Sequence, residues 1–122
     1  MVKKSVLVIE DSEYIARVIA ANFGPDYECT LCGDPRKVLG DIRCGRRPDA
    51  IIMSLNKSGM SALEFLQELR SDRAAAPVPV VVISSEKTSA VRVRLFKAGA
   101  DDFVVKPFNP EELVLRVARC IG

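Results

Sequence analysis

The sequence contains no histidine and no tryptophan among its 122 residues. The absence of histidine excludes Ser-His and Cys-His catalysis, and also every metal site built on imidazole. Long apolar runs are missing too, and none approaches the roughly 20 residues that a membrane-spanning helix requires. The net charge of +2 is too small to indicate a nucleic-acid partner. We therefore expect a single cytoplasmic domain over residues 1–122, with neither a membrane segment nor a nucleic-acid contact.

Cysteine is sparse, with four residues at positions 29, 32, 44 and 120. Cys29 and Cys32 have the spacing of a redox or zinc pair. The other two lie far away in the sequence and no histidine is available, which disfavours a zinc site. We expect small side chains that alternate along a strand instead, because free cysteine behaves as a small buried apolar residue.

Five short apolar runs alternate with amphipathic helical patterns. The first run is apolar throughout from Val6 to Ile9, which is typical of a parallel strand buried on both faces. Helix-start signals separate the runs, such as Asp34 before a proline and Ser61 three residues before Glu64. The pattern predicts a doubly wound α/β domain, with strands at 5–10, 27–32, 49–54, 80–84 and 102–105.

Polar side chains fall at the carboxyl ends of four of these predicted strands or just past them. They are Glu10, Asp11, Ser54, Ser84 and Lys106. In doubly wound sheets, ligands bind beyond the carboxyl ends of the strands. The convergence of these side chains at one edge predicts a functional site there.

These motifs together resemble the receiver domain of two-component response regulators over essentially the whole chain. The matching segments are residues 6–11, 48–55, 80–84 and 99–108, in the order that the family has them. The resemblance implies a flavodoxin-like (βα)5 fold with five parallel strands in the order 2-1-3-4-5. It also implies a role in phosphorelay signal transduction, without enzymatic activity of the domain's own.

The resemblance further implies a magnesium site. Glu10 and Asp11 would hold Mg²⁺ through their carboxylates, and Asn56 would contribute its backbone carbonyl. The resemblance also implies roles for three residues near the family's phosphoacceptor position. Ser84 would contact the phosphoryl oxygens, Lys106 would neutralise charge next to a cis Lys106–Pro107 bond, and Phe103 would be an aromatic switch.

Ser54 stands where the family has its phosphoacceptor aspartate. A serine hydroxyl is neutral at pH 7 and needs an adjacent base to become a nucleophile. Asp49 cannot substitute, because five residues of strand place it about 16 Å away. The loop after Ser54 also departs from the family, which commonly has proline at Ser58 and an Asp-Gly pair at 61–62. We therefore expect no aspartyl phosphate on this chain.

Losing the acceptor carboxylate also removes a metal ligand and a negative charge. Mg²⁺ prefers oxygen ligands and is usually held by carboxylates, so we expect any Mg²⁺ binding to be weak. In place of the ion, we expect Lys106 to pair with Asp11.

The leading interpretation is a receiver-type module that works through protein contacts. A histidine kinase or output domain would bind the surface of helix 87–98, strand 102–105 and the last helix, and a homodimer could pair Arg92 with Glu112. Three alternatives stay open: an ordinary receiver with an engineered Asp-to-Ser block, a Ser54 phosphorylated by a Ser/Thr kinase and, more distantly, a flavodoxin-like ligand-binding domain. The chain is expected to be either a stand-alone receiver or part of a longer protein.

Overall fold

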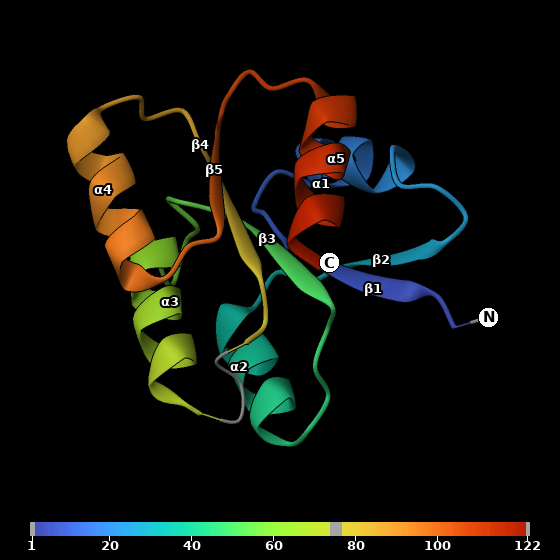
Figure 1. The fold of residues 1–122 in the computed structure, drawn as a ribbon, viewed down its shortest axis with the longest axis horizontal. Helices are drawn as coiled ribbons and strands as arrows, with labels where there is room; N and C mark the ends of the chain where they lie inside the picture. The colour runs from blue at the N-terminus through green and yellow to red at the C-terminus, as the bar shows by residue number, and fades with distance from the viewer. Residues whose placement is uncertain (1, 74–76, 122) are drawn as a thin grey trace.

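The computed structural model describes residues 2–73 and 77–121. Strands and helices alternate strictly along these residues (Figure 1). The elements are β1 (Lys4–Ile9), α1 (Glu13–Ala21), β2 (Tyr27–Leu31), α2 (Pro35–Arg43), β3 (Ala50–Ser54), α3 (Ala62–Ser71), β4 (Val80–Ser84), α4 (Ser89–Ala98), β5 (Asp102–Val105) and α5 (Pro110–Ile121).

The strands form one parallel sheet in the order β2-β1-β3-β4-β5, which confirms the predicted fold. β3 and β4 lie in the interior of the sheet and all their residues are buried. β2 lies at the edge, where its side chains are exposed or half-buried. The degree of apolarity in each run therefore follows its position in the sheet.

Helices cover both faces of the sheet, with α1 and α5 on one side and α2, α3 and α4 on the other (Figure 1). Successive side chains of a strand point to opposite faces. Ala50 and Ile52 of β3 therefore pack in the cluster with α1 and α5, whereas Ile51 and Met53 pack with α2, α3 and α4. This double burial holds β3, and with it Ser54, in a fixed position.

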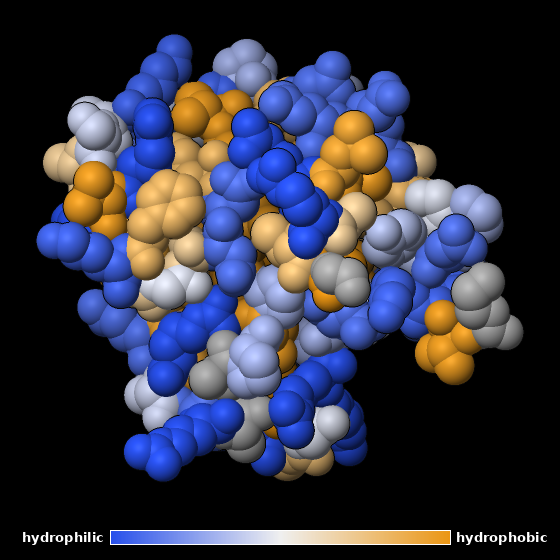
Figure 2. Space-filling model, in the orientation of Figure 1, coloured by the Kyte–Doolittle hydropathy of each residue, from blue (hydrophilic) through white to orange (hydrophobic). Residues whose placement is uncertain are grey.

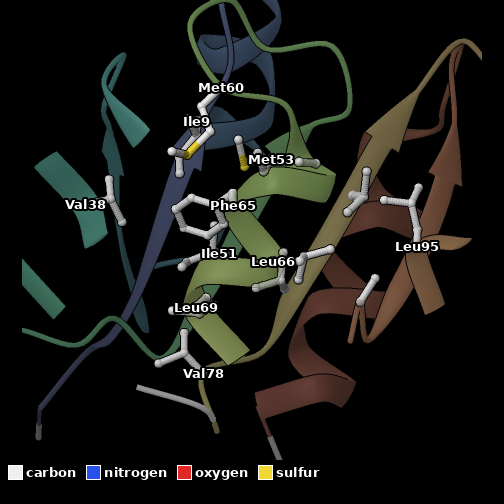
Figure 3. Packing of buried hydrophobic residues seen from close by; sticks show 14 of the residues in the cluster. Ile9, Val38, Ile51, Met53, Met60, Phe65, Leu66, Leu69, Val78 and Leu95 are labelled. Carbon is white, nitrogen blue, oxygen red and sulfur yellow. The ribbon is translucent and has the colours of Figure 1, made fainter. Parts of the chain in front are cut away.

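Phe65 of α3 is fully buried in the larger of the two clusters. Its ring lies close to Ile9, Ile51 and Met53 (Figure 3). Burying a large apolar side chain contributes about 1.5–3 kcal/mol. Phe65 thus fixes α3 on the strands that lead to the polar edge.

Side chains cap the helices, including the two predicted at Asp34 and Ser61. Asp34 accepts a hydrogen bond from the backbone N–H of Arg36 at 3.0 Å. Ser61 Oγ accepts one from the N–H of Glu64 at 3.2 Å, and its hydroxyl lies 3.3 Å from the Glu64 carboxylate. The side chain of Asn109 caps α5 in the same way. Each cap satisfies a backbone donor that the helix leaves free.

α4 is held less firmly than the other helices of its face. It begins at Ser89, two residues later than expected, with Thr88 as its cap. Leu95 is its only buried residue, and Val93 and Phe96 are exposed. The helix ends at Gly99, whose φ of 107° is left-handed. Glycine adopts this conformation without the steric cost that a Cβ would add.

The four cysteines are free thiols. Cys29 lies half-buried on β2, and burial raises the pKa of its thiol to about 11. Within the described ranges, no helix has the length and apolarity needed to span a bilayer.

Candidate functional site

Polar side chains meet at the carboxyl ends of the strands. Ser54 is the last residue of β3 and pairs in register with Ile83, next to Ser84 at the end of β4. Glu10 directly follows β1, and Lys106 directly follows β5. The fold thus brings the predicted positions to one edge of the sheet.

Glu10 and Lys106 are joined by an ion pair. Lys106 Nζ lies 3.4 Å from Glu10 Oε2. The other carboxylate oxygen, Oε1, accepts a hydrogen bond from the backbone N–H of Ser12 at 3.1 Å. The Glu10 side chain is only 5% exposed, so both its oxygens are fixed by the protein.

Asp11 is paired with Lys57. The expected pair between Lys106 and Asp11 is wrong, because Lys106 contacts Glu10 and Lys57 Nζ lies 2.8 Å from Asp11 Oδ1. Ser58 adds two hydrogen bonds to the same carboxylate, from its backbone N–H at 2.8 Å and from its hydroxyl at 2.9 Å. The loop after β3 therefore folds over the end of β1 and binds Asp11 through three donors.

This arrangement strongly favours the ionised form of Asp11. The hydrogen bond from Lys57, followed by that from the backbone of Ser58, lowers the pKa of Asp11 to about 2. Lys57 is 4% exposed, whereas Asp11 is 47% exposed. A buried ammonium group without a partner is energetically costly, and buried lysines are therefore almost always paired. The Asp11 carboxylate supplies that partner for Lys57.

Ser54 and Ser84 are both buried, at 8% and 2% exposure. Ser84 Oγ accepts a hydrogen bond from the N–H of Glu86 at 2.9 Å and so shapes the turn after β4. Asp49 lies at the opposite end of β3, where it accepts a hydrogen bond from the N–H of Ser5 at 2.7 Å. Asp49 therefore binds the backbone at the other end of the strand and is too far away to replace Ser54, as predicted from the strand length.

Phe103 is buried on β5, and the guanidinium carbon of Arg92 lies 5.8 Å from the centre of its ring. This distance is within the range of a cation–π contact. The Lys106–Pro107 peptide bond is cis, as predicted. Asn56 is exposed in the loop that follows β3.

The residues present do not fit a divalent cation. Mg²⁺ requires oxygen ligands in near-octahedral geometry. All four carboxylate oxygens of Glu10 and Asp11 already accept hydrogen bonds from protein donors. Within residues 2–73 and 77–121, no cluster of three or more acidic, cysteine or histidine side chains could hold a metal.

Lys57 is the residue that the sequence analysis missed. A lysine in a polar loop is normally solvated, and nothing in the local pattern shows that the loop turns back over Asp11. One sequence feature does indicate that Lys57 is buried: Leu55 and Met60, on either side of it, are apolar, and both are buried in the structure. A charged residue inside such a segment requires a nearby partner.

The sequence from residue 6 to residue 118 matches the family model of the response regulator receiver domain. The chain is 34% identical over 117 residues to the DNA-binding response regulator MtrA of Mycolicibacterium smegmatis, covering 94% of the chain and 49% of that protein. The chain belongs to the response regulator receiver family. It spans about half the length of the curated relatives it matches.

Solved structures show the same fold. The chemotaxis response regulator CheY4 of Vibrio cholerae superposes with a TM-score of 0.85 at 27% identity, covering 97% of this chain and 98% of that one. The receiver domain of the sensor histidine kinase PA1611 of Pseudomonas aeruginosa has a TM-score of 0.80 at 23% identity, covering 98% of each chain. That structure has a magnesium ion coordinated in its active-site cleft.

Proposed function

We propose that this domain is a receiver-type module of two-component signal transduction that forms no aspartyl phosphate and acts through protein contacts. The single observation that carries the proposal is Ser54 at the end of β3, in place of a carboxylate nucleophile. Its function would be that of a signalling module and not of an enzyme. The four free cysteines support a reducing compartment, as in the cytoplasm.

The acidic pair after β1 is poorly suited to activate the Ser54 hydroxyl. A serine nucleophile needs an adjacent base. Asp11 is held in hydrogen bonds to Lys57 and Ser58, and its lowered pKa makes it a weak base. Glu10 is bound to Lys106. The two carboxylates that follow β1 are therefore engaged elsewhere.

Burial argues against a Ser/Thr kinase as the agent that modifies Ser54. A kinase must position the serine hydroxyl in line with the γ-phosphate of its nucleotide. Ser54 is 8% exposed at the end of a central strand, with both faces of the sheet covered. At this exposure, the loop after β3 would have to move before a kinase active site could enclose the hydroxyl.

The surface of α4, β5 and α5 is the proposed contact for a partner. Hydrophobic residues are exposed over α4 and over α5, with hydrophilic residues between them (Figure 2). The large exposed apolar side chains are Val93 and Phe96 of α4 and Leu115 of α5. A hollow of about 420 Å³ lies between the two helices, lined in part by Phe96, Phe103 and Arg116.

The charged side chains on this surface already have partners within the same chain. Arg116 lies 3.0 Å from Asp102 and 3.3 Å from Glu112, and the Asp102 carboxylate raises the pKa of Arg116 further. Arg92 lies over Phe103. A homodimer that paired Arg92 with Glu112 would therefore compete with contacts inside each copy. We propose that apolar contacts at Val93 and Phe96 contribute most to binding, because exposed ion pairs contribute little.

The test is the reaction with a small phosphodonor. The protein is incubated with acetyl phosphate and Mg²⁺, and its intact mass is measured. A receiver domain with aspartate at the acceptor position serves as the positive control. We expect the control to gain the mass of a phosphoryl group and this chain to remain unchanged. An adduct mapped to Ser54 would overturn the proposal and support a serine acceptor.

A further inference from the structure

The loop after β3 delivers a positive charge into the acidic end of the sheet. Lys57 Nζ lies 2.8 Å from Asp11 Oδ1 and 3.1 Å from the carbonyl oxygen of Ser58, with its side chain 4% exposed. Resting on the function proposed above, we propose that the Lys57 ammonium takes the place of the divalent cation at this site. Ser54 and Lys57 then form a matched pair of replacements, one for the acceptor and one for the metal.

Charge supports this assignment. Glu10 and Asp11 carry two negative charges, and Lys106 and Lys57 carry two positive charges, each ammonium beside its own carboxylate. The site is therefore neutral without a metal ion. A divalent cation would have to displace Lys57 from Asp11, and this would leave a buried ammonium without its partner.

The contacts of Ser58 give independent support for the replacement of the cation by Lys57. Its backbone N–H and its hydroxyl both donate to Asp11, to Oδ2 and Oδ1 respectively. Proline has no backbone N–H and no hydroxyl, so a proline at this position could make neither bond. Lys57 and Ser58 thus act together on one carboxylate, and the loop needs both residue types.

Replacing the acceptor alone should not restore cation binding. Restoring a carboxylate by Ser54→Asp adds a negative charge to a site where Lys57 still occupies Asp11. Cation binding should therefore return only when Lys57 is also replaced. Methionine is a suitable replacement, because its flexible apolar side chain fills the space of the lysine stem.

The experiment measures Mn²⁺ binding by the electron paramagnetic resonance signal of the free ion, confirmed by calorimetry with Mg²⁺. The variants are wild type, Ser54→Asp, Lys57→Met and the double variant. We expect the double variant to bind at least about tenfold more tightly than Ser54→Asp, because a positive charge near the ligands is removed. Lys87→Met, combined with Ser54→Asp, is the matched control, since Lys87 is exposed beside α4.

The proposal is overturned if Ser54→Asp binds Mn²⁺ as tightly as the double variant, or if neither binds. It is also overturned if the Lys87 control raises affinity as much as Lys57→Met does. These outcomes differ from failure of the proposed function, which would show as a phosphoryl adduct on wild type.

A second measurement uses the folded wild-type protein. Lysine side chains are acetylated with an amine-reactive reagent, and the rate at each position is followed by peptide mass spectrometry. Lys57 should react at least about tenfold more slowly than Lys87, because its ammonium is buried and paired. Asp11→Asn should accelerate the reaction at Lys57 and leave Lys87 unchanged. Equal rates for the two lysines in wild type would contradict the assignment.

Discussion

Arg70 of α3 holds the carbonyl oxygen of Gly99 between two donors, with Nη2 at 2.8 Å and Nε at 3.1 Å. The same guanidinium donates to the carbonyl of Val78 and lies 3.0 Å from Asp101. The segment before β4 and the segment between α4 and β5 therefore meet at one side chain of α3. This contact ties the end of α4 to α3 and to the start of β4.

Gly99→Ala should destabilise the protein. The left-handed φ of 107° disfavours any residue with a Cβ, and a Cβ at Gly99 would lie 2.8 Å from atoms of Arg70. We expect a loss of about 2 kcal/mol, measured by urea denaturation followed by far-ultraviolet circular dichroism. Gly40→Ala in α2 is the control, because a Cβ there would lie more than 4 Å from every atom outside the adjoining helix backbone, and alanine favours helix by about 0.5–1 kcal/mol. Destabilisation by both variants would contradict this account.

The two members of the Lys57–Asp11 pair should respond unequally to substitution. Asp11→Ala leaves the buried ammonium of Lys57 without its partner, and we expect a loss of about 2 kcal/mol. Lys57→Met replaces the charge by apolar volume and should change stability by less than about 1 kcal/mol. Urea denaturation of both variants at pH 7 measures the difference. A larger cost for Lys57→Met than for Asp11→Ala would show that the lysine stabilises through other contacts.

The fold was predictable from sequence because each strand had its own apolar run and each helix its own cap. The order of the strands came from family resemblance, since apolar runs do not specify neighbours. The pairs at the site were harder to predict. Lys106 could reach either acidic residue, and the choice depends on where the loop at Lys57 and Ser58 lies. Met60 and Leu55 on either side of the loop pack in the core, and although both are visibly apolar in the sequence, the sequence does not show which carboxylate the loop then covers.

Acid should weaken the protein through Asp11. Its pKa is about 2 in the folded state, below the ordinary value of 3.8. The contribution of Asp11 is therefore fully present above about pH 4 and is lost as the pH falls towards 2. The difference in unfolding free energy between wild type and Asp11→Asn should be constant from pH 7 to about pH 5 and shrink below about pH 4. Urea denaturation across this range measures it, and a difference that stayed constant down to pH 2 would exclude Asp11 as the cause.

The free cysteines should differ in reactivity. Thiolate is the reactive form, and burial raises the pKa of Cys29 to about 11, whereas Cys44 is exposed after α2. At pH 8 we expect iodoacetamide to modify Cys44 first and Cys29 much later, as measured by peptide mass spectrometry. In denaturant, all four should react at similar rates. Equal rates in the folded protein would mean that β2 opens readily.

The single buried anchor of α4, Leu95, has a thermodynamic consequence for recognition. Because so little core area depends on this helix, it can shift or unwind locally while the sheet stays intact. A partner that covers Val93 and Phe96 could bury more apolar surface than α4 loses when Leu95 leaves the core. The position of α4 in a complex would then be set by the bound surface, and different partners could select different placements of the same helix.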